Sequence, residues 1–155
     1  MKHVTRFLIT MGLAMGLAAC QSSQQANGTA TLMPCPATPN CVCSDDDSAR
    51  HSIEPLQATE SVASAWDALL KYLQQQTQVS FTSQRDDYVA VEFRTRWLRF
   101  VDDVEFQARP NEGTIAMRSA SRLGISDLGT NRRRLEQLRA ALAAEGVVHP
   151  HPGDR

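Results

Sequence analysis

Two stretches of the chain carry apolar residues at the spacing of a helix. From Thr59 onward, apolar side chains recur every three or four residues and form one stripe: Val62, Ala65, Trp66, Leu69, Leu70 and Leu73. Either Thr59 or Ser61 can cap the start of this helix, because a hydroxyl accepts from free backbone N–H groups. A second helix is predicted over about residues 131–145, with Gly146 as its stop and an apolar stripe of Leu135, Leu138 and Leu142.

Between these helices the hydrophobic pattern changes to a period of two, which is typical of half-buried strands. We predict strands over residues 79–82, 88–95, 97–109 and 114–118, with a turn at residues 110–113 before the last one. In the long third strand the inner face consists of Leu98, Phe100, Val104, Phe106 and Ala108. The pattern therefore predicts an α+β fold: one antiparallel sheet of about four strands, with two helices packed on one face.

The first 19 residues have the pattern of an export signal. Lys2 and Arg6 precede an apolar run without further charge, and small residues precede Cys20. The run is too short for a comfortable membrane-spanning helix, which needs about 20 apolar residues. The segment Leu17-Ala18-Ala19-Cys20 resembles a bacterial lipoprotein signal, which implies cleavage before Cys20 and acylation of that cysteine. A plain secretory signal and an uncleaved anchor are the alternatives.

Acylation of Cys20 would tether the mature chain to a lipid bilayer through three acyl chains, including an amide-linked one such as palmitate. Such an anchor binds far more strongly than the marginal attachment of a single chain. We therefore expect a cell-envelope protein that faces the periplasm. Gln21 rather than an aspartate follows Cys20, which favours the outer membrane over the inner membrane.

The remaining chain is long enough for one domain with a modest core. Residues 20–33 are mostly small and polar and predict a flexible tether. Residues 34–146 form the predicted domain, and residues 147–155 a disordered tail. The chain has 16 basic and 17 acidic residues, and two of the basic residues lie in the signal, so the mature net charge is −3. Nothing in this balance indicates a nucleic-acid partner.

Three further cysteines follow the tether, and an oxidising compartment favours disulfides between them. Cys35 and Cys41 would close a small loop held by Pro36 and Pro39, whereas Cys35 with Cys43 is the rival pairing. Cys41 and Cys43 are too close in the chain for easy disulfide geometry. Every intramolecular pairing leaves one thiol, which could link the chain to a partner.

Residues Asp45, Asp46, Asp47 and His51 follow these cysteines and raise the question of a metal site. The spacings do not match the paired cysteines of structural zinc sites, and the thiols would tend to be oxidised. We therefore expect no metal and no cofactor.

Asp102 conflicts with the pattern around it. Strict alternation places it on the apolar face of the third strand, where an uncompensated carboxylate costs several kcal/mol. Either a bulge at Asp102 and Asp103 turns the side chain outward, or the side chain meets a cation. Asp103 and Glu105 are expected on the opposite face, in solvent.

A cluster of arginines and hydroxyls near the start of the last helix also conflicts with the local pattern. Three consecutive arginines, residues 132–134, oppose the dipole of the last helix in its first turn. Such a helix start with nearby cations and hydroxyls is a natural anion site. The hypothesised anion-binding residues are Arg118, Ser119, Ser121, Arg122, Asn131, Arg132 and Arg133. Alternatively, the arginines pair internally, with the candidate partners Asp102, Asp103, Glu105 and Asp127.

Three segments carry a family resemblance: residues 35–42, residues 102–106 and the long segment 118–134. They resemble the domain of unknown function 1499 family over roughly residues 34–145. The resemblance implies an exported or membrane-linked protein and carries no established activity. The family usually has serine at the position of Cys43, which supports the Cys35–Cys41 pairing and leaves Cys43 as the odd thiol.

The expected function is that of a non-enzymatic envelope lipoprotein that binds an anionic small molecule or an envelope protein. The alternative is an envelope hydrolase or transferase, with Ser119 or Ser121 as nucleophile and Asp102 or Asp127 as acid or base. No Gly-x-Ser-x-Gly turn is present, and no base is evident within reach of either serine. A third hypothesis is an assembly factor that uses the thiol of Cys43.

Overall fold

The computed structural model describes residues 31–95, 100–124, 126–151 and 153. The predicted signal peptide, Cys20 and most of the predicted tether therefore lie outside the described residues. No helix in the described part of the chain has the length and hydrophobicity needed to cross a membrane.

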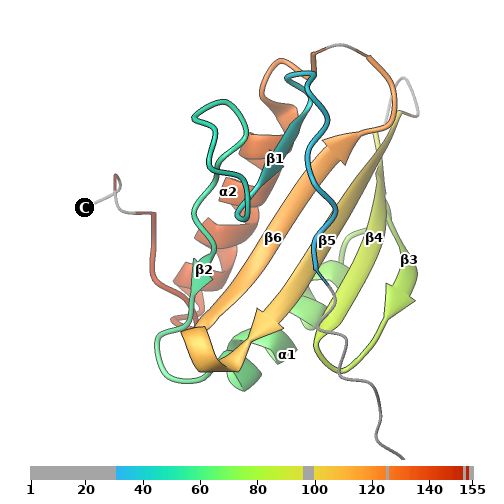
Figure 1. The fold of residues 1–155 in the computed structure, drawn as a ribbon. Helices are drawn as coiled ribbons and strands as arrows, with labels where there is room; N and C mark the ends of the chain where they lie inside the picture. The colour runs from blue at the N-terminus through green and yellow to red at the C-terminus, as the bar shows by residue number, and fades with distance from the viewer. Residues whose placement is uncertain (1–30, 96–99, 125, 152, 154–155) are drawn as a thin grey trace, which may run out of the picture.

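One antiparallel sheet forms the centre of the domain, in the strand order β1-β6-β5-β4-β3, with β2 also paired to β6 (Figure 1). The strands are β1 (Cys41–Cys43), β2 (Leu56–Gln57), β3 (Val79–Gln84), β4 (Tyr88–Arg94), β5 (Val101–Arg109) and β6 (Thr114–Ser121). The predicted α+β class is confirmed, but the sheet has six strands instead of four. Strands β1 and β2 are too short to show alternation in the sequence, and only their pairing with β6 makes them strands.

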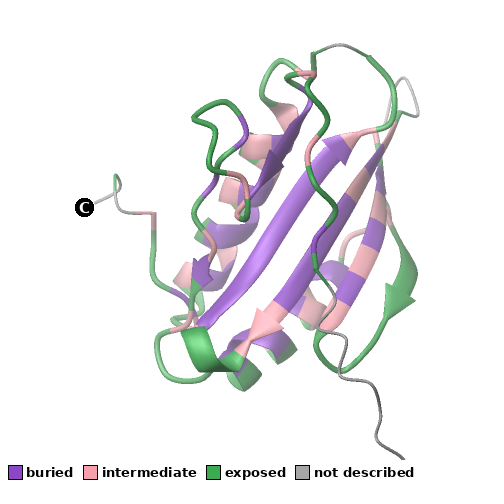
Figure 2. Ribbon diagram, in the orientation of Figure 1, coloured by how far each residue is buried: buried purple, intermediate pink, exposed green. Residues whose placement is uncertain are grey.

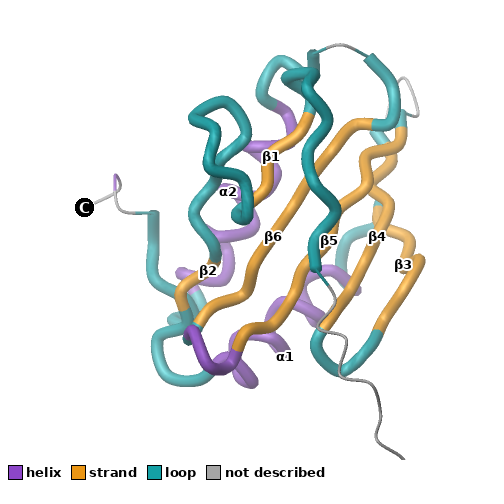
Figure 3. Tube along the Cα trace, in the orientation of Figure 1, coloured by secondary structure: helices purple, strands orange, loops and turns teal. Residues whose placement is uncertain are grey.

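Two helices, α1 (Val62–Gln74) and α2 (Thr130–Ala144), cover one face of the sheet, as predicted (Figure 3). The hydroxyl of Ser61 accepts from the backbone N–H of Ser64 and caps α1. Gly146 follows α2 with a φ of 77°, a left-handed conformation that suits glycine and stops the helix.

The face of the sheet beneath the helices holds the main hydrophobic core (Figure 2). On the face of the sheet that the helices cover, here called the helix face, the core residues change from apolar to polar along β6. At the start of β6 it is apolar, with Ile115 and Met117 opposite Ala108 and Phe106. Toward the end of β6 it is polar, because Ser119 and Ser121 lie opposite Val104 and Asp102.

The extended segment 31–40, here called the strap, lies against part of the opposite face and crosses the sheet in front of β5 and β6 (Figure 1). Leu32 is buried and packs with Cys43 and Ala116. The predicted tether, residues 20–33, therefore extends too far, because its last residues belong to the domain. The outer sheet face offers apolar surface near Ala116 that Leu32 covers.

The ends of two strands also differ from the prediction. Phe100 was expected in the core, but it precedes β5 and is 46% exposed. Leu98 and the predicted start of that strand lie outside the described residues. Strand β6 continues to Ser121, three residues beyond the prediction, because β1 and β5 supply hydrogen-bonding partners on both of its sides.

The first residues of the predicted tail are ordered against the domain. Val148 is buried and pairs with Ala58 in an isolated antiparallel bridge. The backbone N–H of His149 donates to the carbonyl of Gln57 at 2.8 Å. The predicted boundary at residue 146 is therefore wrong, since the core still has an apolar position for Val148.

Candidate functional site

Asp102 lies on the helix face, where its side chain is 4% exposed, and forms an ion pair with Arg134 of α2. Of the two alternatives at this position, the structure therefore shows the cation. A second guanidinium nitrogen of Arg134 donates to Ser119 Oγ at 2.9 Å and to Asn131 Oδ1 at 2.7 Å. The guanidinium also stacks over the ring of Phe93, 4.9 Å from its centroid. Arg134 thus holds the polar end of the core together.

Asn131 is fully buried and connects this ion pair to the strap. Its Oδ1 accepts from Ser119 Oγ at 2.6 Å, and its Nδ2 donates to Ser121 Oγ and to the carbonyl of Asn40, both at 3.0 Å. Asn40 in turn donates to the carbonyls of Ser121 and Gly124. We call Asn40, Asp102, Ser119, Ser121, Asn131 and Arg134 the polar network. It joins the strap, β5, β6 and α2.

Asp127 has a different role from the predicted one. Its carboxylate accepts from the backbone N–H groups of Gly129 and Asn131, at 2.9 and 2.8 Å, and so caps the start of α2. Partial burial acts to raise the pKa of Asp127, but the backbone hydrogen bonds from Asn131 and Gly129 outweigh it and leave the pKa lowered. Asp127 forms no ion pair with any described residue, because the helix N–H groups use its oxygens.

Arg118 lies on the opposite face of β6, beneath the strap. It forms a 2.8 Å ion pair with Glu105, and both side chains are less than a tenth exposed. Glu105 also accepts from the backbone N–H of Met33 at 3.1 Å. The expectation that Glu105 is solvated is therefore wrong, because the strap covers it. Burial, reinforced by the charge of Glu105, raises the pKa of the neighbouring Tyr88.

Arg122 follows β6 on the exposed part of the same face. It pairs with Asp103 at 2.6 Å and with Glu92 at 2.7 Å, and its own side chain is 46% exposed. The hydrogen bond to Asp103, followed by that to Glu92, raises the pKa of Arg122. Exposed pairs of this kind contribute little stability, about 0–1 kcal/mol.

The other two arginines of the hypothesised anion site lie at the start of α2 and bond only to neutral oxygens among the described residues. Arg132 donates to the carbonyl of Ser52 at 2.7 Å. Arg133 donates to the carbonyl of Leu128 at 2.8 Å and to Thr130 Oγ1 at 3.2 Å. The seven hypothesised residues therefore do not converge on one surface: they divide among the strap face, the polar network and the start of α2.

Two leucines lie in the loop between β6 and α2. Leu123 is 69% exposed and Leu128 is 84% exposed, the highest values among the large apolar side chains of the described residues. Leu128 also has a φ of 51°, a left-handed conformation that is uncommon for a bulky side chain. We call Leu123, Leu128, Arg132 and Arg133 the loop surface.

The serines proposed as nucleophiles have no suitable surroundings. Ser119 is fully buried and its hydroxyl donates to Asn131, while Ser121 accepts from the same amide. A nucleophile needs a base within hydrogen-bond reach and access to substrate. The carboxylate of Asp102 is engaged by Arg134, so the geometry offers no support for the hydrolase alternative.

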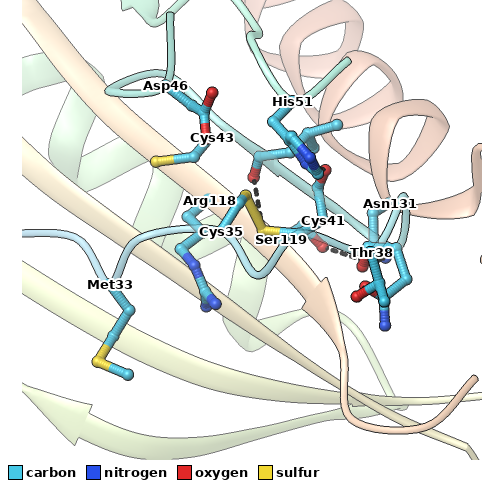
Figure 4. Close-up of a disulfide and its surroundings, with 12 residues drawn as sticks. Met33, Cys35, Thr38, Cys41, Cys43, Asp46, His51, Arg118, Ser119 and Asn131 are labelled. Carbon is cyan, nitrogen blue, oxygen red and sulfur yellow. Dashed lines mark hydrogen bonds between the residues drawn. A yellow bond between two sulfur atoms is a disulfide. The ribbon is translucent and has the colours of Figure 1, made fainter. Parts of the chain in front are cut away.

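The cysteine pairing favoured by the family resemblance is confirmed. Cys35 and Cys41 form a disulfide with a Cα–Cα distance of 5.7 Å (Figure 4). Cys43 is a free thiol that is 2% exposed, and burial raises its pKa. Linkage to a partner through Cys43 therefore lacks structural support, because the sulfur is covered and its reactive thiolate form is disfavoured.

Several residues of the polar network escaped the sequence analysis. Arg134 was recognised only as one of three arginines, and Asn40 had no assigned role. One signal was available: Asn131 precedes Leu135 by four residues and so continues the apolar stripe of α2. A polar residue on a buried stripe must have hydrogen-bonding partners, which is what the structure shows.

Replacing Asp102 by alanine should lower the free energy of unfolding by about 3–5 kcal/mol, because it leaves Arg134 as an uncompensated, largely buried charge. Urea denaturation measures this difference. Asp103→Ala is the matched control, since it removes an exposed pair and should cost less than about 1 kcal/mol. Equal denaturation midpoints for Asp102→Ala and wild type would contradict the importance of this pair.

The cap at Asp127 should give a pH-dependent stability. Above the ordinary aspartate pKa of about 3.9, wild type should exceed Asp127→Ala by about 1 kcal/mol. The advantage should disappear as the pH falls through the lower pKa of the folded state, because protonation weakens the cap. Asp127→Asn keeps a capping oxygen that does not titrate, so its advantage over Asp127→Ala should remain constant. A wild-type advantage that stays constant down to pH 2 would argue against the cap.

Comparison with known proteins adds one finding to this geometry. No curated protein and no solved structure shows significant similarity to the chain. The model of the DUF1499 family, described as a protein of unknown function, matches residues 31–142, which include the strap, the whole sheet and most of α2. The chain therefore belongs to the DUF1499 family.

Proposed function

We propose that this protein is a lipid-anchored, non-enzymatic binding module of the bacterial cell envelope, and that its loop surface binds an anionic ligand with an apolar part. The signal-like segment ending in Cys20 supports the anchor. The loop surface supports the ligand class, because it combines exposed leucines with positive charge. The proposal needs no catalytic group.

The observation that carries the ligand class is the contrast between paired and uncompensated arginines. Arg118, Arg122 and Arg134 each pair with a carboxylate. In the described part of the chain, Arg132 and Arg133 have only carbonyl and hydroxyl acceptors, which leave their charges uncompensated. The carboxylate of Asp127 meets the positive end of the helix dipole, so the guanidinium groups of Arg132 and Arg133 themselves supply the positive charge of the loop surface.

The strap supports a location for the ligand away from the anchor. Leu32 of the strap packs against Ala116. Asn40, at the other end of the strap, donates to the carbonyl of Gly124 in the loop between β6 and α2. Ala116 and Ser121 are separated by about 17 Å of strand, at about 3.4 Å per residue. The described chain therefore begins beside Ala116, toward the start of β6 and away from the loop surface, which favours a ligand other than the anchoring leaflet.

The anchor is tested by growing cells with labelled palmitate. We expect wild type to incorporate the label and to sediment with membranes, and Cys20→Ser to do neither. Cys43→Ser is the matched control and should retain the label, because Cys43 is buried within the domain. Label that persists in Cys20→Ser would exclude Cys20 as the acylated residue.

The ligand class is tested by thermal unfolding of the full chain carrying Cys20→Ser. The probes are glycerol phosphate, dihexanoyl phosphatidylglycerol below its micelle concentration, and the corresponding zwitterionic phosphatidylcholine. We expect the anionic lipid to stabilise most, by about 2.7 kcal/mol at a hundredfold excess over its Kd. Arg133→Ala should abolish the stabilisation, and Leu128→Ser should reduce it for the lipid but not for glycerol phosphate.

Arg85→Ala is the matched control for this experiment, because Arg85 is a distant arginine that stacks 4.8 Å from the ring centroid of Tyr88. Its response to the anionic lipid should equal that of the parent chain. A response that survives Arg133→Ala unchanged would contradict the proposal, as would the absence of stabilisation by both anionic probes.

A further inference from the structure

Three metal-ligating side chains meet beside β1, next to the disulfide partner Cys41. The sulfur of Cys35, a carboxylate oxygen of Asp46 and a ring nitrogen of His51 all lie within 4.8 Å of one another. The sulfur of Cys41 is bonded to that of Cys35 at 2.00 Å. Figure 4 shows His51 and Asp46 on either side of the region above the disulfide. While the disulfide is intact, neither sulfur is a thiolate that could bind a metal ion.

His51 is held in the way that metal-binding histidines are usually held. It is 7% exposed, and its Nδ1 lies 3.0 Å from the carbonyl oxygen of Cys41. A carbonyl only accepts, so Nδ1 carries the proton and Nε2 keeps the lone pair. Histidine ligands commonly donate their other ring N–H to a backbone carbonyl in this manner. The backbone of His51 is fixed as well, since its carbonyl accepts from Cys43 N at 2.8 Å.

Asp46 is oriented by its neighbour Ser48. One carboxylate oxygen of Asp46 accepts from the backbone N–H of Ser48 at 2.9 Å and from its hydroxyl at 2.7 Å. These two hydrogen bonds fix the orientation of the carboxylate. The second carboxylate oxygen has no hydrogen-bond donor among the described residues.

We propose that reduction of the Cys35–Cys41 disulfide converts this cluster into a binding site for one divalent cation of the zinc type. The ligands are the two thiolates, the imidazole of His51 and the carboxylate of Asp46. Two sulfurs, one nitrogen and one oxygen make a suitable tetrahedral set for zinc. The site does not depend on the proposed function of the loop surface, because the two use different residues.

The redox step balances with a dithiol as reductant. The dithiol transfers two electrons and two protons to the disulfide and itself becomes a disulfide, leaving two thiols at Cys35 and Cys41. Binding of the cation then displaces both thiol protons into solvent. Oxidation by a disulfide reverses the exchange and releases the cation, so the two forms of the cysteine pair correspond to an empty and a metal-binding state.

The movement required of Cys35, Asp46 and His51 is small. Zinc bond lengths of about 2.0–2.3 Å place tetrahedral ligand atoms about 3.3–3.8 Å apart. The two sulfurs must therefore separate after reduction, while the ligand atoms of Cys35, Asp46 and His51, which lie within 4.8 Å of one another, move slightly closer together. Cys35 is carried by the strap, whose neighbouring residues Pro34 and Pro36 are exposed, so the displacement need not disturb the core.

Cys43 is the natural control for this proposal. Its sulfur does not belong to the group of ligand atoms formed by Cys35, Asp46 and His51, and it accepts from the backbone N–H of Asp45 at 3.4 Å. Cys43→Ser should therefore leave metal binding intact. Asp47→Asn serves the same purpose for Asp46, since Asp47 is the adjacent exposed carboxylate.

The experiment uses the full chain with Cys20→Ser, with the disulfide either intact or reduced by a phosphine. Cobalt(II) reports thiolate ligation through its sulfur-to-metal charge-transfer absorption, and zinc affinity is measured by competition with a chromophoric chelator. We expect one ion per reduced chain and none per oxidised chain. His51→Ala and Asp46→Asn should each weaken zinc binding by at least about tenfold, as loss of supporting groups alone does in other sites.

Three results would overturn the proposal. One is absence of binding by the reduced chain, and another is equal binding by the oxidised chain. The third is an affinity that both His51→Ala and Asp46→Asn leave unchanged, which would indicate adventitious binding by thiols alone. His51 is buried and its replacement can disturb folding, so circular dichroism accompanies each variant; Asp46→Asn, at a partly exposed position, keeps the test decisive.

Discussion

The ion pair between Asp102 and Arg134 sets the arrangement of this domain. A carboxylate on the helix face of a sheet destabilises the fold unless a cation and hydrogen bonds compensate it. Arg134 is the fifth residue of α2, and it reaches Asp102 only when the helix starts over the beginning of β5 and the end of β6. In that position Asn131 lies between the serines of β6 and the carbonyl of Asn40. The pair thus fixes the placement of the helix and, through Asn131, ties the strap to both.

Neighbouring residues of β6 face two different chemical environments, one on each side of the sheet. Arg118 points beneath the strap toward Glu105, whereas Ser119 points toward α2 and Asn131. The arginines of the segment 118–134 consequently serve different purposes. Some compensate buried or surface carboxylates, and only those at the start of α2 keep a charge that no described carboxylate neutralises.

The strap buries residues on the face of the sheet opposite the helices. It excludes water from Glu105 and Arg118, places Leu32 against Ala116, and carries Cys35 to the disulfide with Cys41. Without such a cover this face would be an exposed surface with charged residues, as the alternation of β5 suggests. The same crossing brings Cys35 within reach of His51 and Asp46.

The sequence by itself determined the α+β class, both helices, the stop of the second helix, and the conflict at Asp102. These follow from local periodicity, capping and the cost of a buried charge, which depend on near neighbours in the chain. The family resemblance identified the disulfide. Only the tertiary structure decided that Arg134 is the partner of Asp102, that Glu105 is buried and that Asp127 caps a helix. It also showed β1 and β2 to be strands and Val148 to be core. Each of these depends on a segment distant in sequence, whose position no local pattern encodes.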